Sequence, residues 1–121
     1  MKKILIVEDD QKISLAMQVR LKLEGYEVDQ AYDAVSGLSM CSQLQPDLVL
    51  LDISLPGGNG FELAHRVKSL VVIPPDFIII TALKDAGLRE KAMQLGAIEY
   101  FEKPYDGGRL LSTIWRWYLN S

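Results

Sequence analysis

Polar and charged side chains stand at or just after the ends of four short apolar runs. These side chains are Glu8, Asp9, Asp52, Thr81 and Lys103. If the apolar runs are neighbouring strands, the carboxylates meet in one small pocket, where two carboxylates about 4 Å apart repel each other by roughly 4 kcal/mol. Such a cluster must bind protons or recruit a cation, and carboxylate and carbonyl oxygens with room for water suit Mg²⁺. The lysine would bring a positive charge to this pocket, and the threonine a hydroxyl group.

Apolar runs alternate with segments of helical spacing, and together these elements must position the polar side chains. We expect strands at residues 4–7, 26–31, 48–51, 77–80 and 99–101. We expect helices from the cap Asp10 to Gly25, from the cap Asp33 to Leu44, and at residues 61–68, 84–95 and 109–119. Several strands are apolar without alternation, which is typical of parallel strands covered on both faces. The sequence therefore predicts an α/β fold, a doubly wound five-stranded parallel sheet with five helices, whose site lies outside the carboxyl ends of the strands.

Apolar residues at helical spacing indicate which faces of two helices pack on the sheet. In the first helix we expect a single stripe made of Leu15, Ala16, Val19 and Leu23. In the last helix we expect core positions at Leu110, Ile114, Trp117 and Tyr118. Trp115 lies at the edge of that stripe, which leaves core packing and a partner surface both open.

The composition excludes several classes of protein. The 121 residues contain 13 Lys and Arg against 16 Asp and Glu, a net charge of −3, so charge gives no reason to bind nucleic acid. No apolar run is long enough to span a membrane or to act as an export signal. The single cysteine, Cys41, cannot form an internal disulfide, which favours a reducing compartment and a cytoplasmic location. Without repeats or low-complexity segments, we expect one domain over residues 1–121.

Four segments, in this order, closely resemble the receiver domain of two-component response regulators, the chemotaxis-regulator-like superfamily. They are residues 4–10 (ILIVEDD), 51–60 (LDISLPGGNG), 80–82 (ITA) and 96–104 (GAIEYFEKP). The resemblance covers nearly the whole chain and implies a flavodoxin-like fold with the strand order 2-1-3-4-5. It also implies a switch that takes a phosphoryl group from a sensor histidine kinase. Such a switch is either free-standing or the N-terminal part of a longer regulator.

The resemblance implies a role for each acidic residue of the pocket. Asp52 is expected to be the phosphoacceptor. Asp9 and Asp52 are expected to bind Mg²⁺ directly, together with the backbone carbonyl of Ser54. Glu8 is expected to hold a water molecule that is coordinated to the Mg²⁺.

The resemblance also implies which residues respond to phosphorylation. Thr81 is expected to donate a hydrogen bond to a phosphoryl oxygen, and Lys103 to pair with another. Tyr100 matches the aromatic switch residue, which turns inward when the threonine moves. The peptide bond between Lys103 and Pro104 is expected to be cis, otherwise a minority state of such bonds.

Phosphorylation is expected to change a face formed by the fourth helix, the fifth strand and the fifth helix. This face would contact an output domain or partner protein, and a phosphorylation-dependent homodimer is one possible outcome. Arg89 and Glu99 fit the charge pattern that regulators with winged-helix DNA-binding domains use to dimerise. Ile98, Arg109 and Thr113 depart from that pattern, which speaks against this ion-pair dimer.

We expect a phosphoacceptor that assists its own modification, and not an enzyme acting on an outside substrate. Three other functions compete with this one: a phosphatase, a cofactor carrier and a pseudo-receiver. A Mg²⁺-dependent phosphatase of the aspartyl-phosphate type would need a second carboxylate where this chain has Ser54. In a flavodoxin-like cofactor carrier, the loop after the first strand must cradle a phosphate, which the acids at 8–10 would repel. A pseudo-receiver that only binds proteins would keep the fold without using the pocket.

Overall fold

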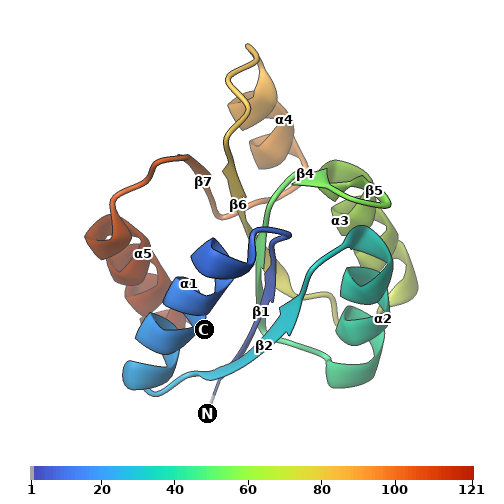
Figure 1. Cartoon of the computed structure of the whole chain (residues 1–121). Coiled ribbons are helices and arrows are strands. Elements are labelled where there is room, and N and C mark those ends of the chain that lie inside the picture. Colours follow the sequence, from blue (N-terminus) through green and yellow to red (C-terminus); the bar gives the residue numbers. More distant parts are fainter. Residues whose placement is uncertain (1) are drawn as a thin grey trace.

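The computed structural model describes residues 2–121 and contains alternating strands and helices (Figure 1). The strands are β1 (Lys3–Val7), β2 (Glu27–Ala31), β3 (Leu48–Leu51), β4 (Ser54–Leu55), β5 (Gly58–Asn59), β6 (Asp76–Thr81) and β7 (Glu99–Glu102). The helices are α1 (Gln11–Leu23), α2 (Ala34–Leu44), α3 (Gly60–Leu70), α4 (Leu88–Gln94) and α5 (Gly107–Leu119). No helix among residues 2–121 is long and apolar enough to cross a membrane.

Five strands form a parallel sheet in the order β2-β1-β3-β6-β7. This order is the predicted 2-1-3-4-5, because the two remaining strands pair only with each other. Those strands, β4 and β5, form a small antiparallel hairpin that is not among the expected strands. The doubly wound α/β fold is thus confirmed, with one additional hairpin directly after β3.

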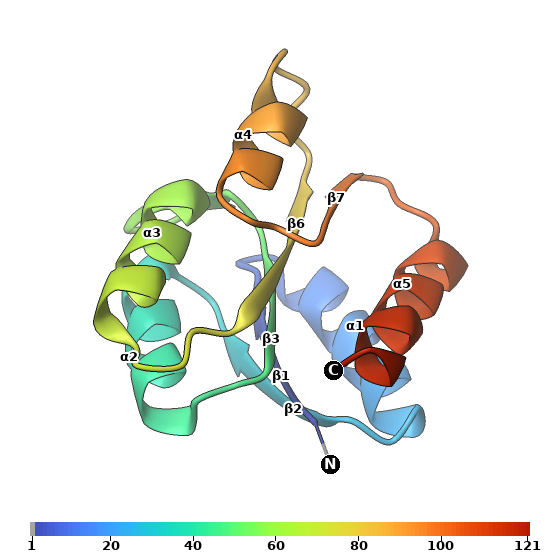
Figure 2. The same cartoon turned by 180° about the vertical axis from the view of Figure 1, so that it is seen from behind.

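Helices cover both faces of the sheet. Figures 1 and 2 show α1 and α5 on one face and α2 and α3 on the other. Along β1, Ile4 and Ile6 enter the core beneath α1 and α5, whereas Leu5 and Val7 enter the core beneath α2 and α3. All four are at most 1% exposed. The unbroken apolar run therefore reflects a strand that is buried on both sides.

Side-chain caps set the starts of α1 and α2 as predicted, whereas α5 begins at Gly107, directly after its cap Asp106, and not at the expected Arg109. Asp10 accepts hydrogen bonds from the amides of the first turn of α1, and Asp33 does so for α2. Gly25 has a φ of +94° just past the end of α1, a conformation that glycine adopts without strain. The expected helix at 84–95 is wrong in its first turn, because Gly87 is left-handed and α4 begins only at Leu88.

The buried face of α1 differs from the predicted stripe. The helix turns Ser14, Met17 and Leu21 towards the sheet. Leu15, Ala16, Val19 and Leu23 are exposed instead. The apolar residues of α1 fall on two stripes, and only contact with the sheet selects the one that is buried.

The predicted core stripe of α5 is correct for three of its four residues. Leu110 and Ile114 are buried, and Trp117 is half-buried. Tyr118 is exposed, and so is Trp115, which stacks against it. The stripe that packs on the sheet is narrower than expected, which leaves two aromatic side chains on the outer side of α5.

Candidate functional site

Three carboxylates gather at the carboxyl ends of β1 and β3. Because Val7 pairs with Leu51 in the sheet, the residues that follow these two positions leave the sheet side by side. Carboxylate oxygens of Glu8, Asp9 and Asp52 lie within 4.8 Å of one another. Glu8 and Asp52 are buried and Asp9 is exposed, so the cluster opens to solvent on one side. The predicted convergence of these residues is confirmed.

Lys103 brings the positive charge into this pocket from the loop after β7. Its Nζ donates a hydrogen bond to Oδ2 of Asp52 at 2.9 Å and another to Oε1 of Glu8. Its backbone N–H donates to the carbonyl of Thr81 at 2.8 Å, and its peptide bond with Pro104 is cis, as predicted. The lysine therefore bridges two acids that lie 95 and 51 residues away in the sequence.

Burial and pairing compete in setting the charges of the pocket. Burial raises the pKa of Glu8, although Lys103 and the amide of Asp10 oppose this change. Burial would lower the pKa of Lys103, but its hydrogen bonds to Glu8 and Asp52 outweigh that effect and raise it. Three carboxylates against one ammonium leave the pocket with two unmatched negative charges. A cluster of hard oxygen donors with this charge suits Mg²⁺.

The Asp52 carboxylate is held at both oxygens. While Lys103 contacts Oδ2 of Asp52, the backbone N–H of Ser54 donates to Oδ1 at 2.9 Å. Ser54 is the first residue of the β4–β5 hairpin, so this hydrogen bond ties the hairpin to the carboxylate. These two hydrogen bonds together orient the Asp52 carboxylate.

The two predicted switch residues lie on neighbouring strands, Thr81 at the end of β6 and Tyr100 on β7. Thr81 is fully buried, and its hydroxyl oxygen accepts a hydrogen bond from the amide of Leu83 at 3.1 Å. Tyr100 is also buried, and its ring lies inside the protein in this structure. The guanidinium of Arg89 lies 5.3 Å from the centre of that ring and donates to the carbonyl of Tyr100 at 3.3 Å.

A comparison with protein families decides which family has this arrangement. Residues 4–115 match the model of the response regulator receiver domain. The chain belongs to this family. The fold and the acidic pocket are thus those of a receiver domain of a two-component system.

Individual relatives agree with this assignment. The chain is 39% identical over 114 residues to the response regulator ArlR of Staphylococcus saprophyticus, covering 94% of this chain and 51% of that protein. It is 35% identical over 117 residues to the DNA-binding dual master transcriptional regulator RpaA of Synechocystis, covering 94% and 48%. The receiver chain therefore spans about half the length of the curated relatives it matches.

Solved structures show the same fold. A CheY-like receiver domain protein from Methanospirillum hungatei superposes with a TM-score of 0.88 at 33% identity, covering 96% of this chain and 92% of that one. The non-phosphorylated receiver domain of HemR from Leptospira biflexa gives a TM-score of 0.87 at 32% identity, covering 96% and 93%.

The receiver structure adds residues that sequence reasoning missed. Nζ of Lys84 donates to the carbonyl of Lys103 at 2.9 Å and pairs with Glu102 at 3.3 Å, so the loop after β6 is fastened to the loop after β7. The side-chain amide of Gln30 donates to the carbonyl of Glu8 at 3.2 Å. Neither residue stands out by spacing or motif, because both contacts arise from the order of strands in the sheet.

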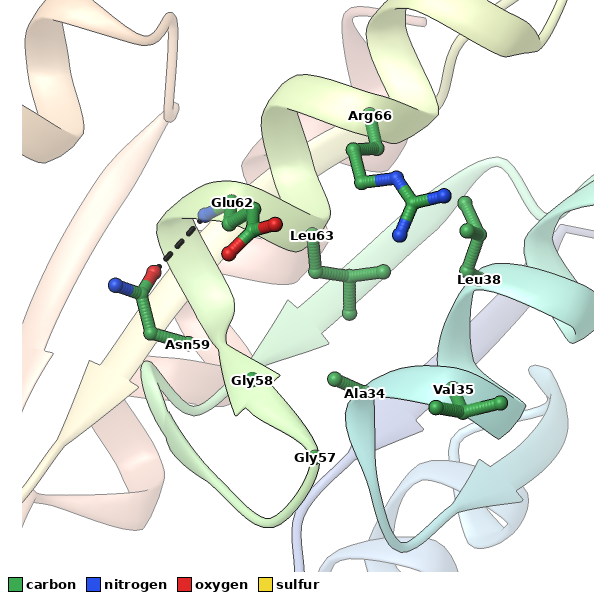
Figure 3. A pocket seen from close by; sticks show the side chains of 9 residues that line it. All are labelled: Ala34, Val35, Leu38, Gly57, Gly58, Asn59, Glu62, Leu63 and Arg66. Carbon is green, nitrogen blue, oxygen red and sulfur yellow. Dashed lines mark hydrogen bonds between the residues drawn. The ribbon is translucent and has the colours of Figure 1, made fainter.

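A separate hollow of the receiver lies beside the hairpin. Figure 3 shows it between α2, the hairpin and α3. Its volume is about 190 Å³. Aliphatic side chains of Val35, Leu38 and Leu63 line it, and Glu62 and Arg66 stand at α3. None of the predicted site residues lines this hollow.

Proposed function

We propose that this receiver is a phosphorylation-dependent signalling switch, in which Asp52 takes a phosphoryl group from a phosphohistidine of a sensor histidine kinase. The observation that carries the proposal is that hydrogen bonds hold both carboxylate oxygens of Asp52. Lys103 holds one carboxylate oxygen and the amide of Ser54 holds the other, at the edge of an acidic pocket. A nucleophile oriented in this way, with a cation beside it, suits phosphoryl transfer, which depends on positioning and on charge neutralisation.

The proposed step uses the residues of the pocket as follows. A carboxylate oxygen of Asp52 forms a bond to phosphorus while the phosphorus–nitrogen bond of the donor breaks, and the imidazole leaves with that electron pair. The ammonium of Lys103 neutralises part of the charge on the phosphoryl oxygens. The hydroxyl oxygen of Thr81 accepts a hydrogen bond from the amide of Leu83, and its own hydrogen can donate to a phosphoryl oxygen.

Mg²⁺ is the cation that we propose for the carboxylate cluster. Asp9, Asp52 and the carbonyl of Ser54 would hold it, with Glu8 binding one of its waters. The support is the convergence of three carboxylates whose charge Lys103 only partly balances. When bound, Mg²⁺ would neutralise the negative charge of the phosphoryl oxygens.

We further propose that the receiver is not an enzyme for an outside substrate and that it has a cytoplasmic location. A phosphatase of the aspartyl-phosphate type would need a carboxylic acid where Ser54 stands.

The proposed output is a change of the α4–β7–α5 face, to which an output domain or a partner protein would bind. In the present structure Arg89 pairs with Glu99 of the same chain at 3.3 Å, so an ion-pair homodimer through these residues would first have to break this bridge.

Intact mass after incubation with acetyl phosphate and Mg²⁺ tests the proposal. We expect the mass of one phosphoryl group on the wild type and none on Asp52→Asn or without Mg²⁺. Since a receiver can ignore small donors, a negative result is repeated with a phosphorylated histidine kinase. Failure with both donors would contradict the proposed switch and favour a pseudo-receiver.

A further inference from the structure

The hollow between α2, the hairpin and α3 is bounded by segments that are joined to one another (Figure 3). The backbone N–H of Ala34, the first residue of α2, donates to the carbonyl of Pro56 in the hairpin turn at 3.0 Å. Asn59, the last residue of the hairpin, accepts a hydrogen bond from the amide of Glu62 at 2.9 Å and so caps α3. The hairpin is therefore fastened to both helices, which holds the walls of the hollow in place.

Glycines leave the hairpin wall of the hollow without side chains. A Cβ at Gly57 would lie 3.7 Å from Cγ2 of Val35, and a Cβ at Gly58 would lie 3.5 Å from the Cβ of Ala34. Because a Cβ alone would already touch α2, larger side chains at these positions would fill part of the space between the hairpin and that helix. The two glycines thus keep this space open.

Aliphatic side chains line the hollow on the two helices. Val35 and Leu38 come from α2, and Leu63 comes from α3. Val35 is 72% exposed, so an apolar group placed in the hollow would remove its surface from water, which is favourable. The volume of about 190 Å³ is below the roughly 300–1,000 Å³ of pockets for drug-sized ligands. The hollow therefore suits a smaller molecule with an aliphatic group.

Two opposite charges of α3, those of Glu62 and Arg66, also line the hollow, and Figure 3 shows both side chains on the side of α3 that faces it. They are four residues apart with the acid first, the order that favours ion pairing along a helix. Neither, however, forms an ion pair with any residue between 2 and 121. The helix dipole favours an acid in the first turn of α3, where Glu62 lies, but gives no reason for Arg66 in the middle of the helix. Both charges are thus free to bind a ligand beside the aliphatic lining.

We propose that this hollow binds a free α-amino acid with a branched aliphatic side chain. The guanidinium of Arg66 would bind its carboxylate, and the carboxylate of Glu62 would bind its ammonium group. Both groups of an α-amino acid are attached to one carbon, and side chains at i and i+4 begin only about 5–6 Å apart, so the two residues can reach them together. The aliphatic side chain of the ligand would cover Val35, Leu38 and Leu63.

Ligands with a single charge fit this hollow less well. A fatty acid or a phosphate group would pair with Arg66 but would be repelled by Glu62, and an amine would pair with Glu62 but would be repelled by Arg66. Each end of a peptide chain also carries only one charge and meets the same repulsion. A ligand with both charges on neighbouring groups neutralises both residues.

Titration of the ¹⁵N-labelled chain with L-leucine at pH 7, followed by NMR, tests the site. We expect saturable shifts at the start of α2, in the hairpin and in the first half of α3. Three analogues each remove one part of the ligand: N-acetyl-leucine lacks the ammonium group, leucinamide lacks the carboxylate, and glycine lacks the aliphatic side chain. Each is expected to bind about tenfold more weakly, because it loses one charge-assisted hydrogen bond or the aliphatic contact.

Exposed variants with matched controls identify the binding groups. Arg66→Gln and Glu62→Gln are each expected to weaken leucine binding about tenfold, and Val35→Ser to weaken it as well. Two control variants remove charges that are also exposed but lie elsewhere: Arg116→Gln on α5, and Glu90→Gln in the first turn of α4. Both controls are expected to leave the affinity for leucine unchanged.

Several results would overturn the proposed amino-acid site. They are the absence of saturable shifts, shifts centred outside the three segments, and an equal loss of binding in the control variants. Equal binding of N-acetyl-leucine or leucinamide would also overturn it and would point to the end of a peptide chain. Phosphoryl labelling of Asp52 reports separately on the acidic pocket, to which neither Glu62 nor Arg66 belongs, so failure of the proposed function remains distinguishable.

Discussion

Replacing Gly60 with alanine tests how closely the end of the hairpin is packed against Asp52. A Cβ at this position would lie 2.5 Å from the carbonyl oxygen of Asp52 and 2.6 Å from the Cα of Ile53. Both contacts are with backbone atoms, which cannot rotate away as a side chain can. The amide of Gly60 also donates to the carbonyl of Ile53 at 2.9 Å, so the two segments are held together. The added methyl group must therefore displace the main chain at Asp52.

The expected cost follows from the balance of two effects. In an ordinary helix, glycine to alanine stabilises by roughly 0.5–1 kcal/mol. Overpacking a rigid site costs about 1–3 kcal/mol and occasionally more. Because the overlap here is with backbone on two sides, we expect Gly60→Ala to lower the free energy of unfolding by about 2 kcal/mol, and to slow phosphoryl labelling of Asp52 through its displaced carboxylate.

Urea denaturation followed by circular dichroism measures the first effect, and intact mass over time the second. Gly108→Ala is the matched control, since its nearest contact beyond its chain neighbours is the side-chain oxygen of Asp106 at 3.2 Å, and we expect it to remain within about 1 kcal/mol of the wild type. A Gly60→Ala protein as stable as this control and labelled at the wild-type rate would refute the reasoning.

Three further perturbations address the buried polar groups. Lys103→Met leaves the Glu8 and Asp52 carboxylates buried without their cation. Urea denaturation at neutral pH without Mg²⁺ should therefore show that the free energy of unfolding falls by about 3 kcal/mol. An unchanged denaturation midpoint would mean that solvent already screens these charges. Burial raises the pKa of Glu8 above its ordinary 4.5. The contribution of Glu8 to the free energy of unfolding is therefore complete below pH 4.5 and is lost as the pH rises through the raised pKa. Glu8→Gln should remove this pH dependence from urea unfolding curves measured between about pH 4 and pH 8. Burial raises the pKa of the Cys41 thiol to about 12, so its contribution to the free energy of unfolding should be lost as the pH rises above 9.0. Iodoacetamide should modify this thiol in urea and not in the native protein, because the native thiol is buried. Rapid labelling of the native protein would contradict that burial.

Local chemistry allowed much of this fold to be predicted from the sequence. The run at 4–7 is apolar at every position because β1 is covered on both faces, and Asp10 and Asp33 cap helices through hydrogen bonds to residues two or three positions away. The acids of the pocket were also predictable, since the carboxyl ends of parallel strands meet at one edge of a sheet.

Other features were decided only by contacts between distant segments. Val19 and Leu23 have the spacing of a buried stripe, yet packing of α1 on the sheet selects Met17 and Leu21 and leaves the first pair exposed. Helical periodicity identifies candidate stripes, but the choice between two of them depends on the shape of the surface that receives the helix.

The same distinction applies within the site. The sequence by itself determined which residue types are present at the strand ends, and hence that acids and a lysine could share a pocket. Only the tertiary structure decided that Lys103 contacts Glu8 and Asp52 together and that Lys84 fastens the Lys103 loop. These contacts join residues as many as 95 positions apart, and such distances depend on strand order and register, which no local pattern encodes.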